Sequence, residues 1–354
     1  MKKRIETLKN EFIKYGIDGY VVPKNDDFFS EYSKINRLKI ISNFSGSAGL
    51  GVILKDKNYL FTDGRYTIQS EMESGKYFKI INYEKIINCK LFKNLKLGLD
   101  PKLFTYTQIK KYFLNQNKVK FISNNLIDKI KTEKIRKNAP FFSLKNKITG
   151  EHRSSKINRI VNYLKKKKAD NLFVTAPENV AWILNIRGSD GPNSPIPNCR
   201  LIINKSKKIF LIADLHKAKI LIKEKIINKS QLINTRDLPK KILLLNDKSF
   251  IIDNNSCSIF FEDIIKSKFK IISREDPTYL LKAIKNKTEI KNMINTHIFD
   301  GVALTKFIYW IKNINKKKIT EVEAQIKLEK FRKKIVITCI QALKLLLDLG
   351  KTEL

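Results

Sequence analysis

The order of helix and strand patterns repeats once along the chain, and this repeat limits the possible folds more than any other feature. In the first copy, Ile5, Leu8 and Phe12 recur at helical spacing before Gly16, and "GYVVP" follows as a short apolar strand. "GLGVIL" and "YLFTD" are then two apolar runs of strand length, separated by the turn-forming "KDKN". A helix, a strand and a hairpin in this order predict an α/β domain with a mixed sheet.

The second copy has the same order of elements. A helical pattern over 157–168 leads to the strand "NLFVT", a short helix within "PENVAWILNI", and the strands "CRLII" and "IFLIAD". Because such a repeat builds two similar units, we predict two tandem α/β domains over 1–135 and 151–276. The basic, proline-containing stretch 136–150 is the predicted linker.

A third unit is predicted over 277–334. Asn286 with Glu289, and Thr320 with Glu323, have the spacing of capping boxes that begin helices. Apolar residues over 290–311 fall on one face of the first helix, and we expect His297 to lie there as a core residue. These two helices have apolar faces, but the sequence that follows them predicts no sheet for those faces to cover.

The charge is strongly basic, with 71 Lys and Arg against 34 Asp and Glu and a net charge of +37. A nucleic-acid binder gathers such residues into a patch, whereas here lysine is spread along the whole chain together with Ile and Asn. Those three residues share A/T-rich codons, so the base composition of the gene explains the charge, and a nucleic-acid partner is disfavoured. No apolar run of about 18 residues and no leader pattern occurs, so we expect no membrane span. The four cysteines are far apart, as expected for reduced thiols in the cytoplasm.

No catalytic or metal-ligating group is predicted in this chain. The three histidines are widely separated, and "FSGSAG" and "LGKTEL" each miss a glycine that the motif they resemble requires. Two polar stretches remain, "TDGRY" and "NIRGSDGPNSPIP". In these stretches Asp63 with Arg65, and Arg187 with Asp190, are interpreted either as ion pairs that fix loops or as residues lining a substrate cleft.

These stretches, in their order and spacing, resemble the three-domain Xaa-Pro aminopeptidases of the creatinase/prolidase metallopeptidase family. The first domain matches through "YGIDGYVVP" and "FSGSAGLGVILKDKNYLFTDGRYTIQ", and the second through "APENVAWILNIRGSDGPNSPIP". The opening of the third domain matches through "DPTYLLKAIKNKTEI", "HIFDGVALTKFIYWI" and "ITEVEAQIKLEKFR". The similarity runs from about residue 5 to Arg332. Gly191 departs from it, because a larger residue is usual there.

The resemblance implies two creatinase-N-terminal-like α/β domains with a ribonuclease-H-like layout, followed by the first helices of a pita-bread catalytic domain. In full-length relatives two Mn²⁺ ions activate a water that cleaves the bond before a penultimate proline. Their ligands lie beyond the similarity, so we expect no metal in this chain and no activity from it. Arg65, Arg187 and Asp190 are then peripheral candidates for the substrate cleft.

Two alternatives stay open. The chain can be half of a split aminopeptidase that works with a complementing catalytic fragment, or it can be a non-catalytic binding or scaffold protein. A homodimer is a further possible assembly. The tail over 335–354 does not resemble the family, and codons for it exist that encode a family-like segment in a shifted reading frame. We therefore expect this tail to be a frameshift product.

Overall fold

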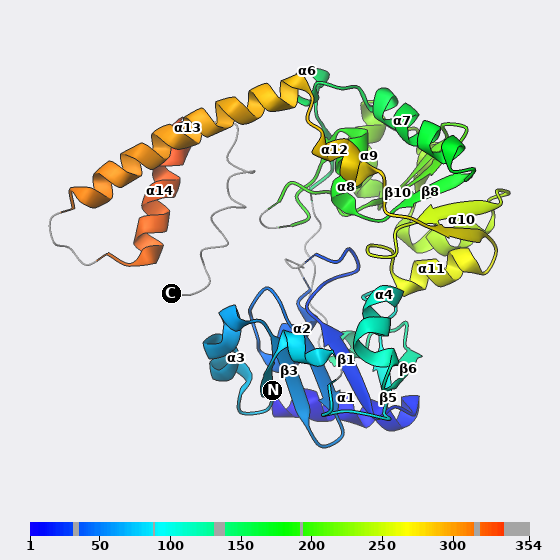
Figure 1. The fold of residues 1–354 in the computed structure, drawn as a ribbon, viewed down its shortest axis with the longest axis vertical. Coiled ribbons are helices and arrows are strands. Elements are labelled where there is room, and N and C mark those ends of the chain that lie inside the picture. Colours follow the sequence, from blue (N-terminus) through cyan, green and yellow to red (C-terminus); the bar gives the residue numbers. More distant parts are fainter. Residues whose placement is uncertain (31–34, 88, 131–138, 192–193, 315–318, 336–354) are drawn as a thin grey trace.

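The computed structural model describes residues 1–30, 35–87, 89–130, 139–191, 194–314 and 319–335, except the side chain of Ile335. Two α/β domains, each built on a six-stranded sheet, are followed by a long helix, α13 (Lys287–Lys312), that extends away from the second domain (Figure 1). The predicted fold class is confirmed. Residues 336–354, which the frameshift hypothesis concerns, lie outside the described residues.

The first sheet has the strand order β4-β3-β2-β1-β5-β6. The predicted hairpin is present, with β2 antiparallel to both β1 and β3. The pairs β1–β5, β5–β6 and β3–β4 are parallel, so the sheet is mixed. The strands are β1 (Gly19–Pro23), β2 (Leu50–Leu54), β3 (Asn58–Thr62), β4 (Lys79–Asn82), β5 (Lys96–Leu99) and β6 (Lys118–Phe121).

Apolar side chains fill both faces of this sheet. On one face lie α1 (Lys2–Tyr15), α2 (Arg37–Ser42) and α5 (Leu126–Ile130), and α4 (Tyr106–Ile109) packs on the other. α3 (Thr67–Ser74) packs along β3 and β4. The predicted end of the first helix is confirmed, because Gly16 has the left-handed φ of 54° that closes α1.

The second sheet has the equivalent order, β12-β11-β10-β8-β13-β14, and equivalent strand directions. α7 takes the place of α1, and α8 and α9 complete that face, while α10 and α11 cover the opposite face. The strands are β8 (Asn171–Val174), β10 (Arg200–Asn204), β11 (Ile209–Ile212), β12 (Leu232–Ile233), β13 (Ser249–Ile252) and β14 (Lys270–Ser273). The helices are α7 (Arg153–Lys166), α8 (Pro177–Leu184), α9 (Leu215–Lys223), α10 (Leu238–Leu243), α11 (Ile259–Lys266) and α12 (Thr278–Ala283).

The described part of the predicted linker, residues 139–150, packs on the second domain. β7 (Phe142–Ser143) pairs with β9 (Ile186–Arg187), and Phe141 is buried in the second domain's core. α6 (Asn146–Thr149) ends at Gly150, where a Cβ would lie 2.3 Å from Oδ1 of Asn286. Glycine at this position therefore allows the end of the linker to approach the start of α13 closely.

α13 and α14 (Glu321–Ile335) pack on each other and begin at the predicted capping boxes. Much of their apolar surface is uncovered by the part of the chain that the structure describes, as predicted. The expectation that His297 lies in a core is wrong, because it is on this exposed helix and faces solvent. Twelve large apolar side chains on the two helices are more than 40% exposed: Ile290, Met293, Ile294, Ile298, Phe299, Val302, Leu304, Ile308, Tyr309, Ile311, Val322 and Ile326.

Candidate functional site

The carboxyl ends of the parallel strands in both sheets meet at the boundary between the domains. Residues after β5 contact residues after β13: Ile259 N–H donates to the Phe104 carbonyl at 2.9 Å, and Phe260 N–H donates to that of Pro101 at 3.1 Å. In open α/β sheets, ligands usually bind at this edge, where the strand order reverses. The polar groups at this edge are therefore the first candidates for a functional site.

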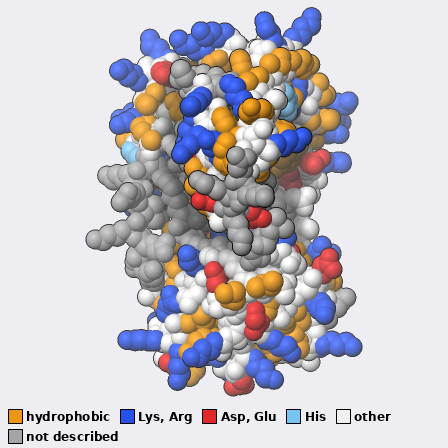
Figure 2. Space-filling view, turned by 90° about the vertical axis from the view of Figure 1, so that its left-hand side faces the viewer, with side chains coloured by type: hydrophobic (Ala, Val, Ile, Leu, Met, Phe, Trp, Pro, Cys, Tyr) orange, Lys and Arg blue, Asp and Glu red, His pale blue; other side chains and the backbone are white. Residues whose placement is uncertain are grey.

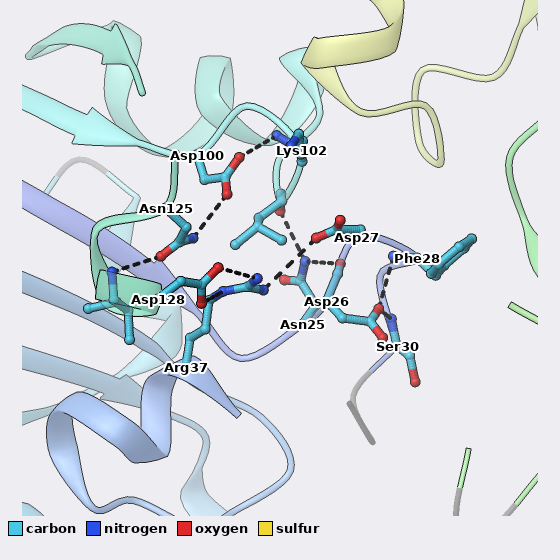
Figure 3. A network of polar contacts seen from close by, with 12 residues as sticks. Asn25, Asp26, Asp27, Phe28, Ser30, Arg37, Asp100, Lys102, Asn125 and Asp128 are labelled. Atoms are coloured by element: carbon cyan, nitrogen blue, oxygen red, sulfur yellow. Dashed lines mark hydrogen bonds and ion pairs between the residues drawn. The ribbon is translucent and has the colours of Figure 1, made fainter. Parts of the chain in front are cut away.

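The loop that follows β1 is held by its own side chains (Figure 3). Oδ1 of Asp26 accepts hydrogen bonds from the N–H groups of Phe28 (2.9 Å) and Ser30 (3.0 Å). Aspartate is favoured in loops because its side chain can accept hydrogen bonds from nearby backbone N–H groups and form a local turn of this kind. Asn25 ties the loop to the neighbouring strand end by donating to the Leu103 carbonyl at 3.0 Å. Burial raises the pKa of the Asp26 carboxyl, although the two N–H donors oppose that shift.

A buried arginine connects this loop to two helices. Arg37, only 9% exposed, donates from Nε and Nη2 to the two carboxylate oxygens of Asp128, at 2.8 and 2.9 Å. Its Nη1 lies 3.9 Å from Oδ1 of Asp27 (Figure 3). Burial alone would lower the pKa of Arg37, but the hydrogen bonds to Asp128 and the nearby carboxylates raise it. Arg37 is therefore held as a cation inside the domain.

Asp100 occupies the carboxyl end of β5 beside this network. It accepts from Lys102 N–H at 3.0 Å and from Nδ2 of Asn125 at 3.0 Å. Burial raises its pKa. Because both carboxylate oxygens are engaged by donors from the chain itself, Asp100 fixes the strand-end loop.

The second domain repeats this arrangement at the level of side chains. Asp253 follows β13 as Asp100 follows β5, and its Oδ1 accepts from Asn255 N–H at 2.9 Å. Its Oδ2 accepts from Asp276 N–H at 3.2 Å, and Asp276 in turn accepts from Nδ2 of Asn179 at 2.8 Å. The duplication therefore includes an aspartate that organises the loop at each strand end.

Arg200, at the start of β10, links the two domains. Its guanidinium donates to the Asp27 carbonyl and lies over two rings, with its carbon 4.1 Å from the Phe28 centroid and 4.6 Å from the Phe261 centroid. Elsewhere on the boundary, the Tyr106 hydroxyl donates to Oδ1 of Asp263 at 2.6 Å. The network at the strand ends thus positions loops and couples the domains.

Arg65 is confirmed in the ion pair predicted for it. It donates from Nε and Nη2 to the two oxygens of Asp63, at 3.1 and 2.8 Å, and it lies over the Tyr66 ring. Hydrogen bonding by Arg65 lowers the pKa of Asp63. The side chain of Arg65 is 59% exposed, and it stands at the carboxyl end of β3 on the same sheet edge as the loop after β1.

The predicted ion pair between Arg187 and Asp190 is wrong. Arg187 donates from Nη1 to the carbonyls of Ile186 (2.9 Å) and Ala181 (3.4 Å) at the end of α8, where a cation complements the helix dipole. Asp190 is buried and lies 3.0 Å from Nζ of Lys217 instead. Its Oδ2 also accepts from Asn198 N–H at 2.6 Å, so Asp190 fastens its loop to α9 and to the segment before β10.

The described residues include no group of three or more His, Cys, Asp or Glu side chains that could hold a metal ion. Within the same ranges, no helix is long and apolar enough to cross a membrane. Cys89, Cys199 and Cys257 are free and buried, and Cys339 lies outside the described residues. Figure 2 shows Lys and Arg side chains at both ends of the visible face, interspersed with other side-chain types, and this does not favour a nucleic-acid patch.

Sequence reasoning missed Asp26, Arg37, Asp128 and Arg200. A usable signal did exist for Asp26, since "KNDDF" directly follows the buried strand "GYVVP", the position where α/β sheets carry functional side chains. Arg200 opens the otherwise apolar strand "CRLII", which is only a weak sign of a buried cation. The pairing of Arg37 with Asp128 crosses 91 positions of sequence and leaves no local pattern.

Fold and network together define a class: tandem α/β domains with mixed sheets, joined through the loops at their strand ends. Two family models, each described as the creatinase/prolidase N-terminal domain, match residues 4–130 and 132–289. The chain belongs to the creatinase/prolidase N-terminal domain family.

Several relatives of similar sequence are Xaa-Pro aminopeptidases. The chain is 31% identical over 371 residues to Xaa-Pro aminopeptidase 1 of Dictyostelium discoideum, a match covering 94% of this chain and 57% of that protein. It is 29% identical over 341 residues to Xaa-Pro aminopeptidase ApepP of Drosophila melanogaster, covering 90% and 55%. The chain therefore spans little more than half the length of these relatives.

A solved structure has the same fold. X-prolyl aminopeptidase from Caenorhabditis elegans, described as a cytosolic enzyme with a di-nuclear active site, superposes with a TM-score of 0.80 at 23% identity. The match covers 94% of this chain and 59% of that one. At this identity the similarity shows the fold.

Proposed function

We propose that this chain forms the N-terminal, cleft-shaping part of a metal-dependent Xaa-Pro aminopeptidase, the class of enzyme that removes an N-terminal residue preceding proline. The observation that carries the proposal is the extent of the similarity. Both α/β domains match one family, and 94% of the chain aligns with a relative named Xaa-Pro aminopeptidase 1.

The proposal assigns no catalytic step to the described residues. A dinuclear manganese centre, the cofactor expected in full-length relatives, needs several convergent carboxylate and imidazole ligands. No such group occurs among the residues that the structure describes, so they do not fit the metal pair. We propose that the 354-residue polypeptide neither holds these ions nor cleaves peptides unaided.

Peptides with a penultimate proline are the proposed substrate, and the two arginines are its proposed peripheral contacts. Arg65 is preorganised by Asp63, and its side chain is largely exposed at the carboxyl end of β3, where a peptide could reach it. Arg187 is partly buried and uses Nη1 for backbone carbonyls. Asp190, already paired with Lys217, serves in this proposal to hold the loop that carries Arg187.

The proposed organisation keeps the sequence-based division: domains at 1–135 and 151–276, a linker at 136–150, and the start of a catalytic unit at 277–334. The proposed partner is a polypeptide carrying the rest of that unit, and a homodimer is the second possibility. A cytoplasmic location is proposed because a relative is described as cytosolic and the described cysteines are free.

The decisive experiment measures metal content and peptide cleavage by the purified 354-residue protein. We expect no stoichiometric Mn²⁺ by mass spectrometry and no release of N-terminal residues from X-Pro peptides. Metal-dependent turnover that co-purifies with the chain through successive columns would refute the proposed division of labour.

A complementation experiment tests the enzyme class itself. The part of the Dictyostelium relative that lies beyond the match would be co-expressed with this chain, and Mn²⁺-dependent cleavage of X-Pro peptides would be assayed. Activity that appears only with both parts supports the proposal, and an Arg65→Met variant should then raise KM. A stable complex without activity would instead favour a scaffold function.

A further inference from the structure

A fully buried cation is shared by the two domains, and neither the ion-pair predictions nor the proposed function uses it. Arg200 is 4% exposed and comes from β10 of the second domain. Its flat guanidinium lies over the ring of Phe28 in the first domain and over the ring of Phe261 on α11. Burial lowers its pKa, and nearby Asp27 and Asp26 oppose that shift.

We infer that Arg200 is a positioning residue, through which the second domain fixes the conformation of the loop 24–30 in the first. The inference is independent of aminopeptidase activity, and it concerns how the two domains act as one unit.

The first step in the argument is the chemistry of the contact. A guanidinium can lie over aromatic faces and still donate hydrogen bonds in its own plane, and Arg200 lies over both rings while its Nη2 donates to the Asp27 carbonyl. A lysine ammonium in this position would lack the flat surfaces that match the two rings. The site is therefore specific for arginine, not merely for positive charge.

The second step is the dependence of the loop on this contact. Phe29 has a left-handed φ of 57°, which is unfavourable for a side chain of that size. The Asp26 turn holds the two N–H groups on either side of Phe29. Arg200 anchors two groups of the loop, the Phe28 ring and the Asp27 carbonyl, to the second domain. Without those anchors, we expect the loop to open while the sheet below it stays folded.

Other contacts across the boundary make this local opening measurable. Hydrogen bonds from Ile259 to Phe104 and from Tyr106 to Asp263 also hold the domains together, and neither involves Arg200 or the loop 24–30. Loss of Arg200 therefore need not separate the domains, and the loop can respond by itself.

The test is hydrogen exchange of backbone amides in the full-length chain, comparing Arg200→Met and Arg200→Lys with the unaltered protein. We expect the amides of Phe28 and Ser30 to exchange about ten-fold faster or more in Arg200→Met, while those of β13 stay within about two-fold. Arg200→Lys should recover only a small part of the protection, because the lysine retains charge but not planarity. Arg236→Met, at an exposed arginine of the second domain, is the matched control and should change neither set.

Two results would overturn the inference: loop amides in Arg200→Met within about two-fold of the unaltered protein, or equal loss of protection in the loop and in β13. If Arg200→Met does not fold, Phe28→Leu removes the same stacking contact from the first domain. It should accelerate loop exchange similarly, and an unchanged loop in that variant would also refute the role of Arg200.

Discussion

Arg37 on α2 and Asp128 on α5 form a two-point ion pair, with Nε to Oδ1 at 2.8 Å and Nη2 to Oδ2 at 2.9 Å. The arginine side chain is 10% exposed and the aspartate 44%, so the pair is buried on one side only. It fastens two helices that cover the same face of the first sheet. The two helices depend on it because α2 has six residues and α5 five, too few to be stable alone.

We therefore predict that Arg37→Met destabilises the first domain. The expected loss is about 2 kcal/mol, below the usual cost of breaking a fully buried pair because water reaches Asp128. Chemical denaturation followed by circular dichroism measures it. Lys39→Met, at an exposed position on the same helix, should change stability by no more than about 0.5 kcal/mol, and equal losses in both variants would contradict the prediction.

Asp26 predicts a pH dependence, because burial raises its pKa in the folded state. Above the ordinary aspartate value of about 3.9, the unfolded chain loses this proton before the folded chain does. The folded state then binds more protons, so this group makes the protein less stable as pH rises from that value through its raised pKa. Asp26→Asn keeps an acceptor for the N–H groups of Phe28 and Ser30 and removes the titration.

The measurement is the free energy of unfolding between about pH 4 and 7 for both proteins. We expect the advantage of the unaltered protein over Asp26→Asn to shrink as pH rises. Asp56→Asn, at an exposed residue of the hairpin turn, serves as the control for the loss of one carboxylate from the first domain. An advantage that grows with pH would mean that the N–H donors outweigh burial.

The fold was largely predictable because its signals are local. A helix closed by Gly16, the "KDKN" hairpin and the cap at Asn286 each depend on residues within a few positions, and all are present. The repeated order of elements then allowed a single inference for both domains. Only the core position expected for His297 was wrong, because periodicity reveals an apolar face but not what covers it.

The candidate site was less predictable because its contacts are non-local. Arg65 was paired correctly with Asp63 two residues away, whereas Arg187 was paired wrongly with Asp190 three residues away. The cation that pairs with Asp190 is Lys217 on α9. The sequence alone does not show that α9 lies beside the loop that carries Asp190. Arg200 was the hardest residue to predict, because its contacts with Asp27 and Phe28 form only where the two domains meet.

The exposed apolar faces of α13 and α14 predict where the chain is most vulnerable to proteases. The far end of α13 contacts α14, whereas its start is anchored by Asn286 and Asn292, which donate to the carbonyls of Thr149 and Ile148. Limited proteolysis at low enzyme ratio should therefore cut first beyond residue 292 and leave the two α/β domains intact. A first cut within either sheet, made before any cut in α13, would contradict this prediction.

The same apolar faces should cause self-association at high concentration, since contiguous exposed apolar side chains favour contact with other molecules. Replacing Ile298 and Tyr309, 58% and 71% exposed, with glutamine should lower the apparent mass in light scattering without changing the melting of the domains. Ile13→Gln is the control, because Ile13 is 88% exposed on α1. Equal reduction by the control would locate the association elsewhere.

Lys156 on α7 predicts a second pH dependence, in the alkaline range. Its side chain is 1% exposed, and its Nζ donates to the Trp182 carbonyl at 2.9 Å and to Oδ1 of Asn185 at 2.7 Å. The ammonium also lies 4.2 Å from the Trp182 ring centroid. Burial nevertheless lowers the pKa of Lys156 to about 8, although Glu151 and Glu289 oppose the shift.

Between about pH 8 and the ordinary lysine value of about 10.4, the unfolded chain therefore carries a proton here that the folded chain has lost. Stability contributed by this group should rise with pH across that window, since the unfolded state binds more protons. Lys156→Met removes the titration, so the free energy of unfolding of the unaltered protein should increase relative to the variant from pH 8 to 10. Lys165→Met, at an exposed position on the same helix, corrects for the general effect of removing one lysine from a strongly basic chain. A difference that falls with pH would show instead that the hydrogen bonds and the ring hold Lys156 charged in the folded protein.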